Sequence, residues 1–210
     1  MRNGQQQRSG GPSGDGGGNG RGGGDKIDVL GRLLSRVLRH MALEHMRSDG
    51  YVKVNDVLNL DLKTFANIPL KSHTIDDIRE AVRKDNKQRF GLLEENGELL
   101  IRANQGHSIK TIESDNLLKP ILSAEEAPVC VHGTYTKNLE SILNTGLKRM
   151  KRLHVHFSSA LPTDGEVISD GMKLYISENK VILTEGFNGV VAVKYIEKIE
   201  TWPHRQLVPF

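Results

Sequence analysis

Four short clusters of basic and hydroxyl side chains in this sequence could take part in chemistry. In the cluster at residues 101–108, Gly106 would let a ligand approach the backbone closely. The side chains around it that can form hydrogen bonds with a phosphate or a sugar are Arg102, Gln105, His107 and Ser108. A polar loop that simply leaves a hairpin would have a similar composition, so both interpretations are open from the residues alone.

Two further clusters place Arg beside His or an aromatic residue. Arg39 and His40 come together near the end of an expected helix, where cations also interact favourably with the helix dipole. Arg89 stands in the sequence KQRF at residues 87–90, and such an Arg is often only a charge at the edge of a strand. Each of these clusters can therefore be a ligand site or a solvated surface.

A fourth cluster, at residues 151–158, contains Arg152 and two histidines. Strand alternation would place His154 and His156 on one face of a strand. Two imidazoles could bind a metal, but no Cys or carboxylate within a few residues completes a ligand set. We therefore expect no metal site.

The loop VHGT at residues 131–134 joins an apolar strand to a following helix. His132, Gly133 and Thr134 supply an imidazole, a glycine and a hydroxyl there. Short polar loops between a strand and a helix commonly bind small anionic ligands. The loop is not the GxGxxG of a dinucleotide-binding Rossmann fold, and the sequence has no P-loop.

Composition limits the class of protein. The 210 residues carry a formal net charge of +3 and are 37% apolar, and so small a charge does not by itself indicate nucleic-acid binding. The single cysteine, Cys130, excludes a disulfide framework and the usual Cys-based zinc sites. It favours a reducing compartment, cytoplasmic or nuclear. No stretch is apolar enough to span a membrane and no signal-peptide core is present, so we expect no membrane association.

The elements that must position these clusters begin with three short helices and a hairpin. Apolar residues recur at spacings of three and four from residue 28 to about residue 46, which predicts a helix with Arg39 and His40 on or near its opposite flank. Helices are also expected at residues 54–60 and 74–83, the latter capped by Thr74. Two strand-like runs at residues 88–102 surround Asn96-Gly97, a strong hairpin signal. This order is typical of a winged-helix lobe.

The whole chain is expected to be α+β and to have five parts. Residues 1–25 form a Gly-rich tail that is expected to be disordered, and residues 26–119 form the winged-helix lobe. Prolines bracket an expected linker at residues 120–128. Residues 129–200 form a mixed α/β lobe, with strands near 129–131, 154–157, 181–183 and 190–195 and a helix at 137–143 that Gly146 ends. Residues 201–210 form an extended tail.

Taken in order, these clusters resemble the RNA 2′-phosphotransferase family, enzymes that remove the splice-junction 2′-phosphate from tRNA with NAD. The matching motifs are LSRVLRH (34–40), KQRF (87–90), IRANQGHS (101–108), VHGT (131–134), RLHVHFS (152–158) and ISDGM (168–172), and the similarity resumes at KLYISENKVILTEG (173–186). The resemblance implies a winged-helix RNA-binding lobe followed by an ADP-ribosyltransferase-like lobe. It also implies NAD as co-substrate without a metal, 2′-phosphorylated tRNA as partner, and a monomer.

The resemblance also implies roles for individual residues. The family's Arg-His-Arg-Arg set matches Arg39, His40, Arg89 and Arg152. In the implied reaction the RNA 2′-phosphate attacks C1″ of the nicotinamide ribose and expels nicotinamide; the ribose 2″-hydroxyl then attacks phosphorus and releases 2′-OH RNA and ADP-ribose 1″,2″-cyclic phosphate. Substrate groups make both attacks, so the protein must mainly hold a phosphate, which suits Arg.

The remaining motifs would bind the two substrates. The resemblance assigns the ADP-ribose part of NAD to His132, Gly133, Thr134 and His154. It assigns the RNA near the junction to Arg102, Gln105, His107 and Ser108. The sequence departs from the family pattern after Met172, where a strand and a helix normally follow but the chain continues directly to Lys173. We expect an internal deletion in the NAD lobe at this point.

Two other functions stay open at the level of sequence. One is a catalytically inactive RNA-binding protein, which would bind RNA but show no rise in melting temperature with NAD. The other is an ADP-ribosyltransferase that acts on phosphorylated nucleic-acid ends. That enzyme needs only the first chemical step and would leave ADP-ribose attached to the nucleic acid.

Overall fold

Helix α1 (Lys26–His40) supplies the apolar face around which the first half of the chain folds. In this computed structural model, which describes residues 25–159 and 172–210, six of its side chains are buried: Val29, Leu30, Leu33, Leu34, Val37 and Leu38. The Asp25 carboxylate caps the first turn by accepting a hydrogen bond from the Ile27 amide. The helix ends at His40 because Met41 is extended, so the predicted continuation to about residue 46 is wrong. Residues 43–51 form turns instead, one of them with His45 at φ 65°.

The predicted second and third helices and the hairpin are confirmed. Helix α2 spans Val54–Leu58 and α3 spans Ile75–Lys84. Thr74 and Asp77 cap α3 reciprocally, each side chain accepting from the other residue's amide. Strands β2 (Phe90–Glu95) and β3 (Glu98–Ala103) pair across Asn96 and Gly97, which both have the positive φ that this tight turn requires. A short strand, β1 (Val52–Lys53), pairs with the other edge of β3, so the sheet order is β1-β3-β2.

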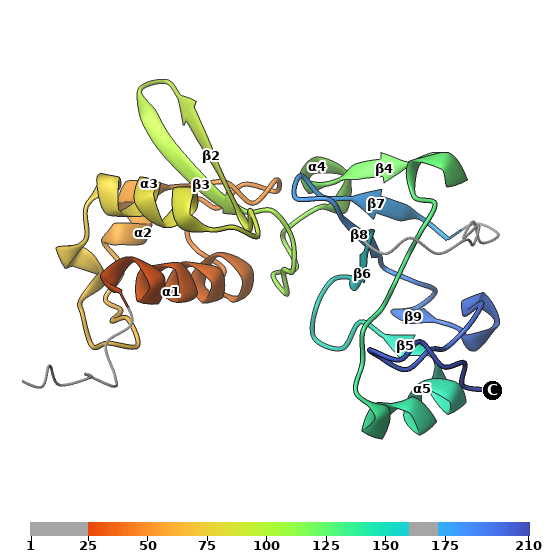
Figure 1. Cartoon of the computed structure of the whole chain (residues 1–210). Helices are drawn as coiled ribbons and strands as arrows, with labels where there is room; N and C mark the ends of the chain where they lie inside the picture. The colour runs from red at the N-terminus through yellow and green to blue at the C-terminus, as the bar shows by residue number, and fades with distance from the viewer. Residues whose placement is uncertain (1–24, 160–171) are drawn as a thin grey trace, which may run out of the picture.

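One continuous core holds this first half together. The apolar face of α1 packs on α2, α3 and the sheet, and the fully buried side chains include Leu30, Leu34, Leu70, Ile78 and Ile101. Figure 1 shows α1 and α3 lying on one side of the hairpin. The chain leaves this core after β3 and continues into the second half of the molecule.

The second half is built on an antiparallel four-stranded sheet with the order β4-β7-β8-β6. Its strands are β4 (Lys119–Ile121), β6 (Val155–Ser158), β7 (Leu174–Ile176) and β8 (Val181–Thr184). Helix α4 (Ser114–Leu117) precedes β4, and its Leu117 packs with Ile109 and Ile112 against Tyr175 and Leu183. Residues 109–119, which we expected in the first lobe, thus pack with the second half. The expected linker at 120–128 begins inside β4 and contains the short 3-10 helix η2 (Ala124–Glu126).

A smaller layer completes the second half. The 3-10 helix η3 (Thr136–Asn138) leads into α5 (Leu139–Thr145), which ends where Gly146 adopts φ 78°. Strands β5 (Leu147–Lys148) and β9 (Val190–Val191) pair with each other, and the 3-10 helix η4 (Val193–Tyr195) follows. Of the strand expected at 129–131, only Val131 pairs, through a bridge to Ser158. The expected tail at 201–210 turns back on itself, since Leu207 forms a bridge to Glu200.

Some of the sequence-based expectations concern residues that the structure does not describe. The tail at residues 1–24 and most of the ISDGM motif, residues 168–171, lie outside them. Met172, after which we expect the deletion, is the first residue described beyond that gap. Among the helices of residues 25–159 and 172–210, none is both long and apolar enough to cross a membrane.

Candidate active site

Arg39 lies in the last turn of α1 with its guanidinium turned inward, against the backbone of Gly106. A Cβ placed on Gly106 would lie only 3.3 Å from Arg39 Nε, and Gly106 has φ 90°, so glycine suits this close contact. Arg39 Nε and Nη2 are buried and have no hydrogen-bond partner in the described part of the chain. Burial, together with the nearby charges of Arg152 and Arg89, lowers the pKa of Arg39 to about 10. These unpaired N–H groups can therefore donate hydrogen bonds to an anionic ligand.

Arg89 reaches the same place from the loop between α3 and β2. Its backbone amide and its Nη1 both donate to the Asp85 carboxylate, the latter at 2.9 Å. Asn104 holds the loop from the other side, because its amide donates to the Arg89 carbonyl and its side chain donates to the Gln88 carbonyl. The Arg89 guanidinium is thus positioned by one carboxylate and keeps further donors for a ligand.

Arg152 comes from the second half of the molecule, in the loop between β5 and β6. The Arg149 guanidinium fixes this loop by donating to the Arg152 carbonyl at 2.8 Å. The next residue, Leu153, donates its amide to the His107 carbonyl at 2.8 Å, which brings the loop against the first half. Three cations from distant parts of the sequence therefore meet where the two halves join.

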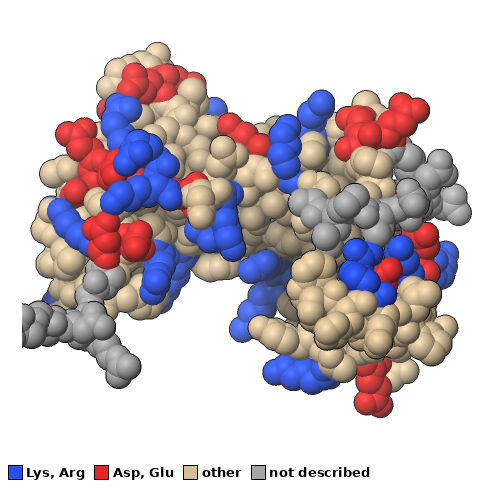
Figure 2. Space-filling model, in the orientation of Figure 1, with Lys and Arg blue, Asp and Glu red and all other residues tan. Residues whose placement is uncertain are grey.

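His40 borders the same cluster. Its Nδ1 lies 3.0 Å from Ser108 Oγ, and the Arg39 carbonyl accepts from the Ser108 amide at 2.9 Å. Burial and then the charges of Arg39, Arg152 and Arg36 lower the pKa of His40, so its neutral form is favoured. The structure thus brings together the four residues of the predicted catalytic set. Figure 2 shows Lys and Arg atoms along the crease between the two halves.

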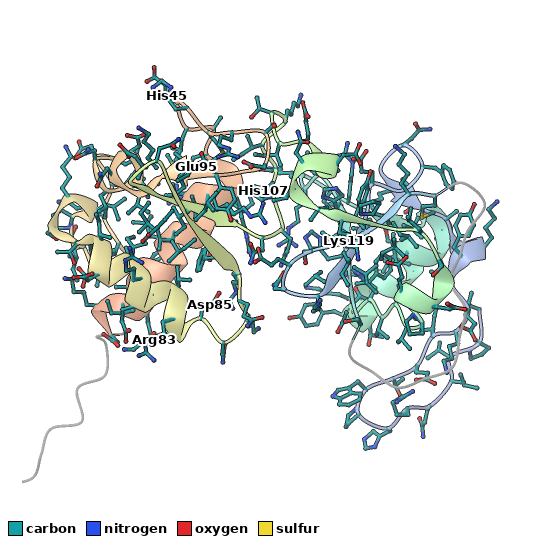
Figure 3. All side chains as sticks on the ribbon, turned by 90° about the horizontal axis from the view of Figure 1, so that it is seen from above. His45, Arg83, Asp85, Glu95, His107 and Lys119 are labelled. Carbon is teal, nitrogen blue, oxygen red and sulfur yellow. The ribbon has the colours of Figure 1, made fainter. Side chains whose placement is uncertain are left out.

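The expected RNA-binding residues are not equivalent in the structure. Gln105 is half-buried, and Ser108 positions His40. His107 is 1% exposed, and both of its ring nitrogens are buried without a partner in the described chain. Burial and the nearby Arg39 lower its pKa to about 3. Figure 3 shows His107 where the two halves join, inside the protein rather than on an RNA-accessible surface.

Arg102 is also engaged within the protein. It donates to the Glu178 carboxylate at 3.2 Å and to the Asp49 carbonyl at 3.3 Å, and it stacks over the Tyr51 ring at 4.6 Å. Only 15% of the side chain is exposed. The sequence predicted that the Arg102 guanidinium binds RNA. In this structure it contacts protein groups.

A cavity of about 660 Å³ lies in the second half, and the VHGT loop lines it. His132, Gly133 and Thr134 contribute to its wall together with apolar side chains of α5, β5 and β9. His132 Nδ1 lies 2.9 Å from the His156 carbonyl, and the charges of Arg152 and Arg39 reach His156. His132 in the cavity wall thus contacts His156, which lies near two of the arginines, and the volume of the cavity suits a small-molecule ligand.

His154, which we expected to contact the cofactor, does not line this cavity. It is 2% exposed, and its Nε2 lies 2.9 Å from the Ser114 hydroxyl, which in turn donates to Glu185 at 2.7 Å. Strand β6 begins only at Val155, and His154 just before it faces the α4 side of the sheet. His154 is therefore part of the packing between α4 and the sheet.

Two features of the site were not among the residues that the sequence assigned to it. His156 is largely buried next to the arginines, with Nε2 unpaired among the described residues and its pKa lowered to about 4, mainly by burial. The turn at residues 196–208 forms one wall of the cavity, where Arg205 pairs with Glu200 at 2.6 Å. The apolar residues spaced along that segment, such as Ile196, Ile199 and Val208, were the available signal.

A bound metal needs a set of ligand side chains that lie close together. Within residues 25–159 and 172–210, no three or more His, Cys, Asp or Glu side chains come together as a possible ligand set. Cys130 is half-buried in the cavity wall, and burial raises the pKa of its thiol to about 11, so it stays protonated.

Comparison with known proteins identifies close similarities. The model of a family described as "RNA 2'-phosphotransferase, Tpt1 / KptA family" matches residues 25–186. A mouse protein named tRNA 2'-phosphotransferase 1 is 37% identical, covering 87% of this chain and 80% of its own length. A zebrafish protein of the same name is 35% identical over 81% of this chain and 84% of its own length. A Schizosaccharomyces pombe relative is 36% identical over 81% of this chain, which spans half (50%) of that protein's length.

These alignments also bear on the departure after Met172. The alignment with the mouse protein runs over 209 positions, although it takes in only 87% of the 210 residues here. The mouse protein therefore has internal residues with no counterpart in this chain. The deletion after Met172 stays a prediction.

Proposed function

Since this chain belongs to the RNA 2′-phosphotransferase family, Tpt1 / KptA, we propose that it removes the 2′-phosphate that splicing leaves in tRNA and transfers it to NAD. The products are 2′-OH RNA, ADP-ribose 1″,2″-cyclic phosphate and nicotinamide. One observation carries this proposal: Arg39, buried and with unpaired donors, faces Arg89 and Arg152. A dianionic phosphate is the ligand that such a cluster favours most.

The arginines hold and neutralise the phosphate. The unpaired Nε and Nη2 of Arg39 can bind two of its oxygens at once, as a planar guanidinium does. Arg89 and Arg152 lie near Arg39 from the two sides of the crease, so a bound phosphate would offset the repulsion among the three cations. Because these donors are held in place before the substrate arrives, they stabilise charge that develops during transfer.

His40 orients the phosphate and can move a proton. Its Nδ1 is held by Ser108, and its other ring nitrogen has no hydrogen bond to the described residues. The lowered pKa keeps the ring neutral near pH 7, so Nε2 can accept a proton from a substrate hydroxyl or, with the other tautomer, donate to a phosphate oxygen. The ring thus supplies the acid–base group that the arginines cannot.

The cavity in the second half is suited to the ADP-ribose part of NAD. Bound there, NAD would supply the ribose carbon that accepts the phosphate and the nicotinamide leaving group. His132, Gly133 and Thr134 line the wall, and Gly133 leaves open space because an added Cβ would meet no atom within 4 Å. Apolar side chains line much of the rest of the cavity.

The finer assignments belong to this proposal as well. The first half, with three helices and the β1-β3-β2 sheet, is consistent with a winged-helix lobe that binds RNA. The second half would be the ADP-ribosyltransferase-like lobe. The single Cys130 supports a cytoplasmic or nuclear enzyme, and we propose that it acts as a monomer, since all four catalytic residues come from one chain.

The test is to incubate the purified chain with NAD and an RNA that carries one internal 2′-phosphate. Nicotinamide release, loss of phosphate mass from the RNA and appearance of ADP-ribose cyclic phosphate would support the proposal. Arg152→Ala should lower all three by roughly a hundredfold or more, whereas Arg79→Ala, which removes an exposed Arg that pairs with Glu94, should change none.

Other outcomes would identify a different function. RNA binding without nicotinamide release would indicate an inactive RNA-binding protein. Nicotinamide release with ADP-ribose left on the RNA would indicate an ADP-ribosyltransferase that stops after the first step. Either result would overturn the proposed function.

A further inference from the structure

The turn between β7 and β8, at residues 177–180, projects from the second half toward the first. Its backbone is tightly held: the Ser177 amide donates to the Val181 carbonyl and the Lys180 amide donates to the Ser177 carbonyl, both at 2.9 Å. The buried Ser177 hydroxyl also bonds Asn179 Oδ1 at 2.8 Å. Glu178 and Asn179 are therefore presented on a rigid support.

Both of these side chains contact the first half. Glu178 accepts from Arg102 at 3.2 Å, and Asn179 donates to the Lys87 carbonyl at 3.0 Å. Arg102 is oriented for this contact by Tyr51 and by the Asp49 carbonyl, both in its own half. Close packing surrounds the contact, since a Cβ on Gly91 would lie 3.3 Å from the Tyr51 hydroxyl and 3.4 Å from the Glu178 carboxylate.

The two contacts are linked to different members of the arginine cluster. Lys87 lies two residues before Arg89, in the loop whose position sets where Arg89 points. On the other side, β8 leaves the turn and pairs with β6, Val155 opposite Thr184, and β6 begins three residues after Arg152. The turn thus connects the loop of Arg89 to the strand pair that follows Arg152.

We propose that Glu178 and Asn179 are positioning residues, which set the distance across the crease between the arginines of the two halves. This inference rests on the proposed function for its chemical consequence but not for its structural one. The repulsion among Arg39, Arg89 and Arg152 favours an open crease, and the contacts made by the turn oppose it. Arg102 then serves the site through Glu178, without touching RNA.

The alternative is that Arg102 binds RNA, as its sequence motif suggested. The two roles respond oppositely to Glu178→Gln. If Arg102 is an RNA ligand that Glu178 blocks, the substitution frees it and RNA binding becomes tighter. If the turn positions the halves, RNA binding does not become tighter, and phosphate transfer slows because the arginines no longer converge.

The first experiment compares Glu178→Gln with Glu94→Gln in the full chain. Glu94 is a matched control because it also pairs with an Arg, Arg79 at 2.6 Å, but both partners lie in the first half. We expect kcat for phosphate transfer to fall about tenfold or more in Glu178→Gln, with KM for RNA changed less, and to stay unchanged in Glu94→Gln. Equal kcat values, or tighter RNA binding by Glu178→Gln, would overturn the inference.

Charge reversal separates positioning from general destabilisation. Glu178→Arg and Arg102→Glu each place like charges together and should lower kcat further, whereas the double variant restores opposite charges and should recover part of the loss. If Arg102 only packs on the Tyr51 ring, the double variant should recover none of the lost kcat. Melting temperatures of all variants show whether each one folds.

A distance measurement makes the inference independent of activity. With Cys130 replaced by Ser, spin labels on Cys substituted for the exposed Glu44 and Lys137 report the separation of the two halves. Glu178→Gln should broaden or lengthen the distance distribution, and Glu94→Gln should not. If the chain proves inactive but the distance shifts, the proposed function fails and the positioning role stands; an unchanged distribution contradicts the positioning role.

Discussion

The two halves of the molecule hold their parts of the site in different ways. The first half presents Arg39 from a helix with six buried side chains and Arg89 from a loop fixed by Asp85 and Asn104. The second half presents Arg152 from a loop, and its apolar residues fall into two small clusters, one of which borders the cavity. None of the residues of α5 is buried. A closely packed first half thus faces a less densely packed second half, and this difference suits the proposed site, which must admit a nucleotide.

The largest expected effect concerns the arginines themselves. Arg39→Ala and Arg152→Ala should each lower phosphate transfer by roughly a hundredfold to a thousandfold, the usual size for losing one preorganised donor to a developing charge. Because Nε and Nη2 of the half-buried Arg39 are buried without a partner in the described part of the chain, its removal should leave the melting temperature unchanged or raise it. Kinetics and thermal unfolding of both variants check this pair. A large fall in melting temperature in Arg39→Ala would show that the residue is structural.

Core substitutions should sharpen the contrast between the halves. Leu34→Ala removes a fully buried side chain from α1 and should cost about 2–5 kcal/mol of unfolding free energy. Leu143→Ala, in the α5 helix, removes a half-buried side chain and should cost about 1 kcal/mol. Denaturant unfolding measures both. Equal costs would mean that the second half is as tightly packed as the first.

The cavity predicts a specific response to NAD. A saturating excess of about 100 times Kd should stabilise the folded chain by about 2.7 kcal/mol. Gly133→Phe should abolish the NAD-induced rise in melting temperature while leaving the apo melting temperature nearly unchanged, because an added Cβ meets no atom within 4 Å there. A full NAD shift in that variant would place the nucleotide elsewhere.

Buried histidines at the junction make stability depend on pH. His107 and His156 have folded pKa values lowered to about 3 and about 4 by burial, against an ordinary value of 6.5. Between these limits the unfolded chain binds more protons, so their contribution is fully present above pH 6.5 and is lost as pH falls toward 4. Each should contribute a slope of at most about 1.4 kcal/mol per pH unit. His107→Leu should flatten the curve measured from pH 7 to pH 4.5; an unchanged slope would contradict this assignment.

The smallest expected effect lies on the outer flank of α1. Arg36 is exposed, its charge reaches His40, and it pairs with no carboxylate among the described residues. Arg36→Ala should weaken RNA binding a few-fold and reduce the dependence of binding on salt by about one counterion. The fold and the response to NAD should not change. Binding isotherms at several salt concentrations test this. If the dependence of RNA affinity on salt is unaltered, Arg36 does not contact the RNA.

The sequence predicted local features well and long-range ones poorly. The periodicity of α1, the Thr74 cap and the Asn96-Gly97 turn each depend on residues that are close in sequence, and all three are confirmed. The pairing of β4 with β7, which moved residues 109–121 into the second half, joins segments more than fifty residues apart. No local pattern carries such a pairing.

The same distinction applies to the site. Arg39, His40, Arg89 and Arg152 could be chosen because motif order pointed to them, and the structure brings them together. The burial of His107 and the pairing of His154 with Ser114 could not be foreseen, because both depend on segments distant in sequence; Ser114 lies 40 residues before His154. The partner of Arg102, Glu178, lies 76 residues away.

The most direct test of a site shared by the two halves is a difference in RNA affinity. Binding of one RNA with and without an internal 2′-phosphate is measured for the unaltered chain, Arg39→Ala and Arg152→Ala, without NAD. We predict that the phosphate strengthens binding to the unaltered chain and that either variant loses this gain to a similar extent. If Arg152→Ala keeps the full gain, the phosphate binds to the first half alone, and the site is not shared.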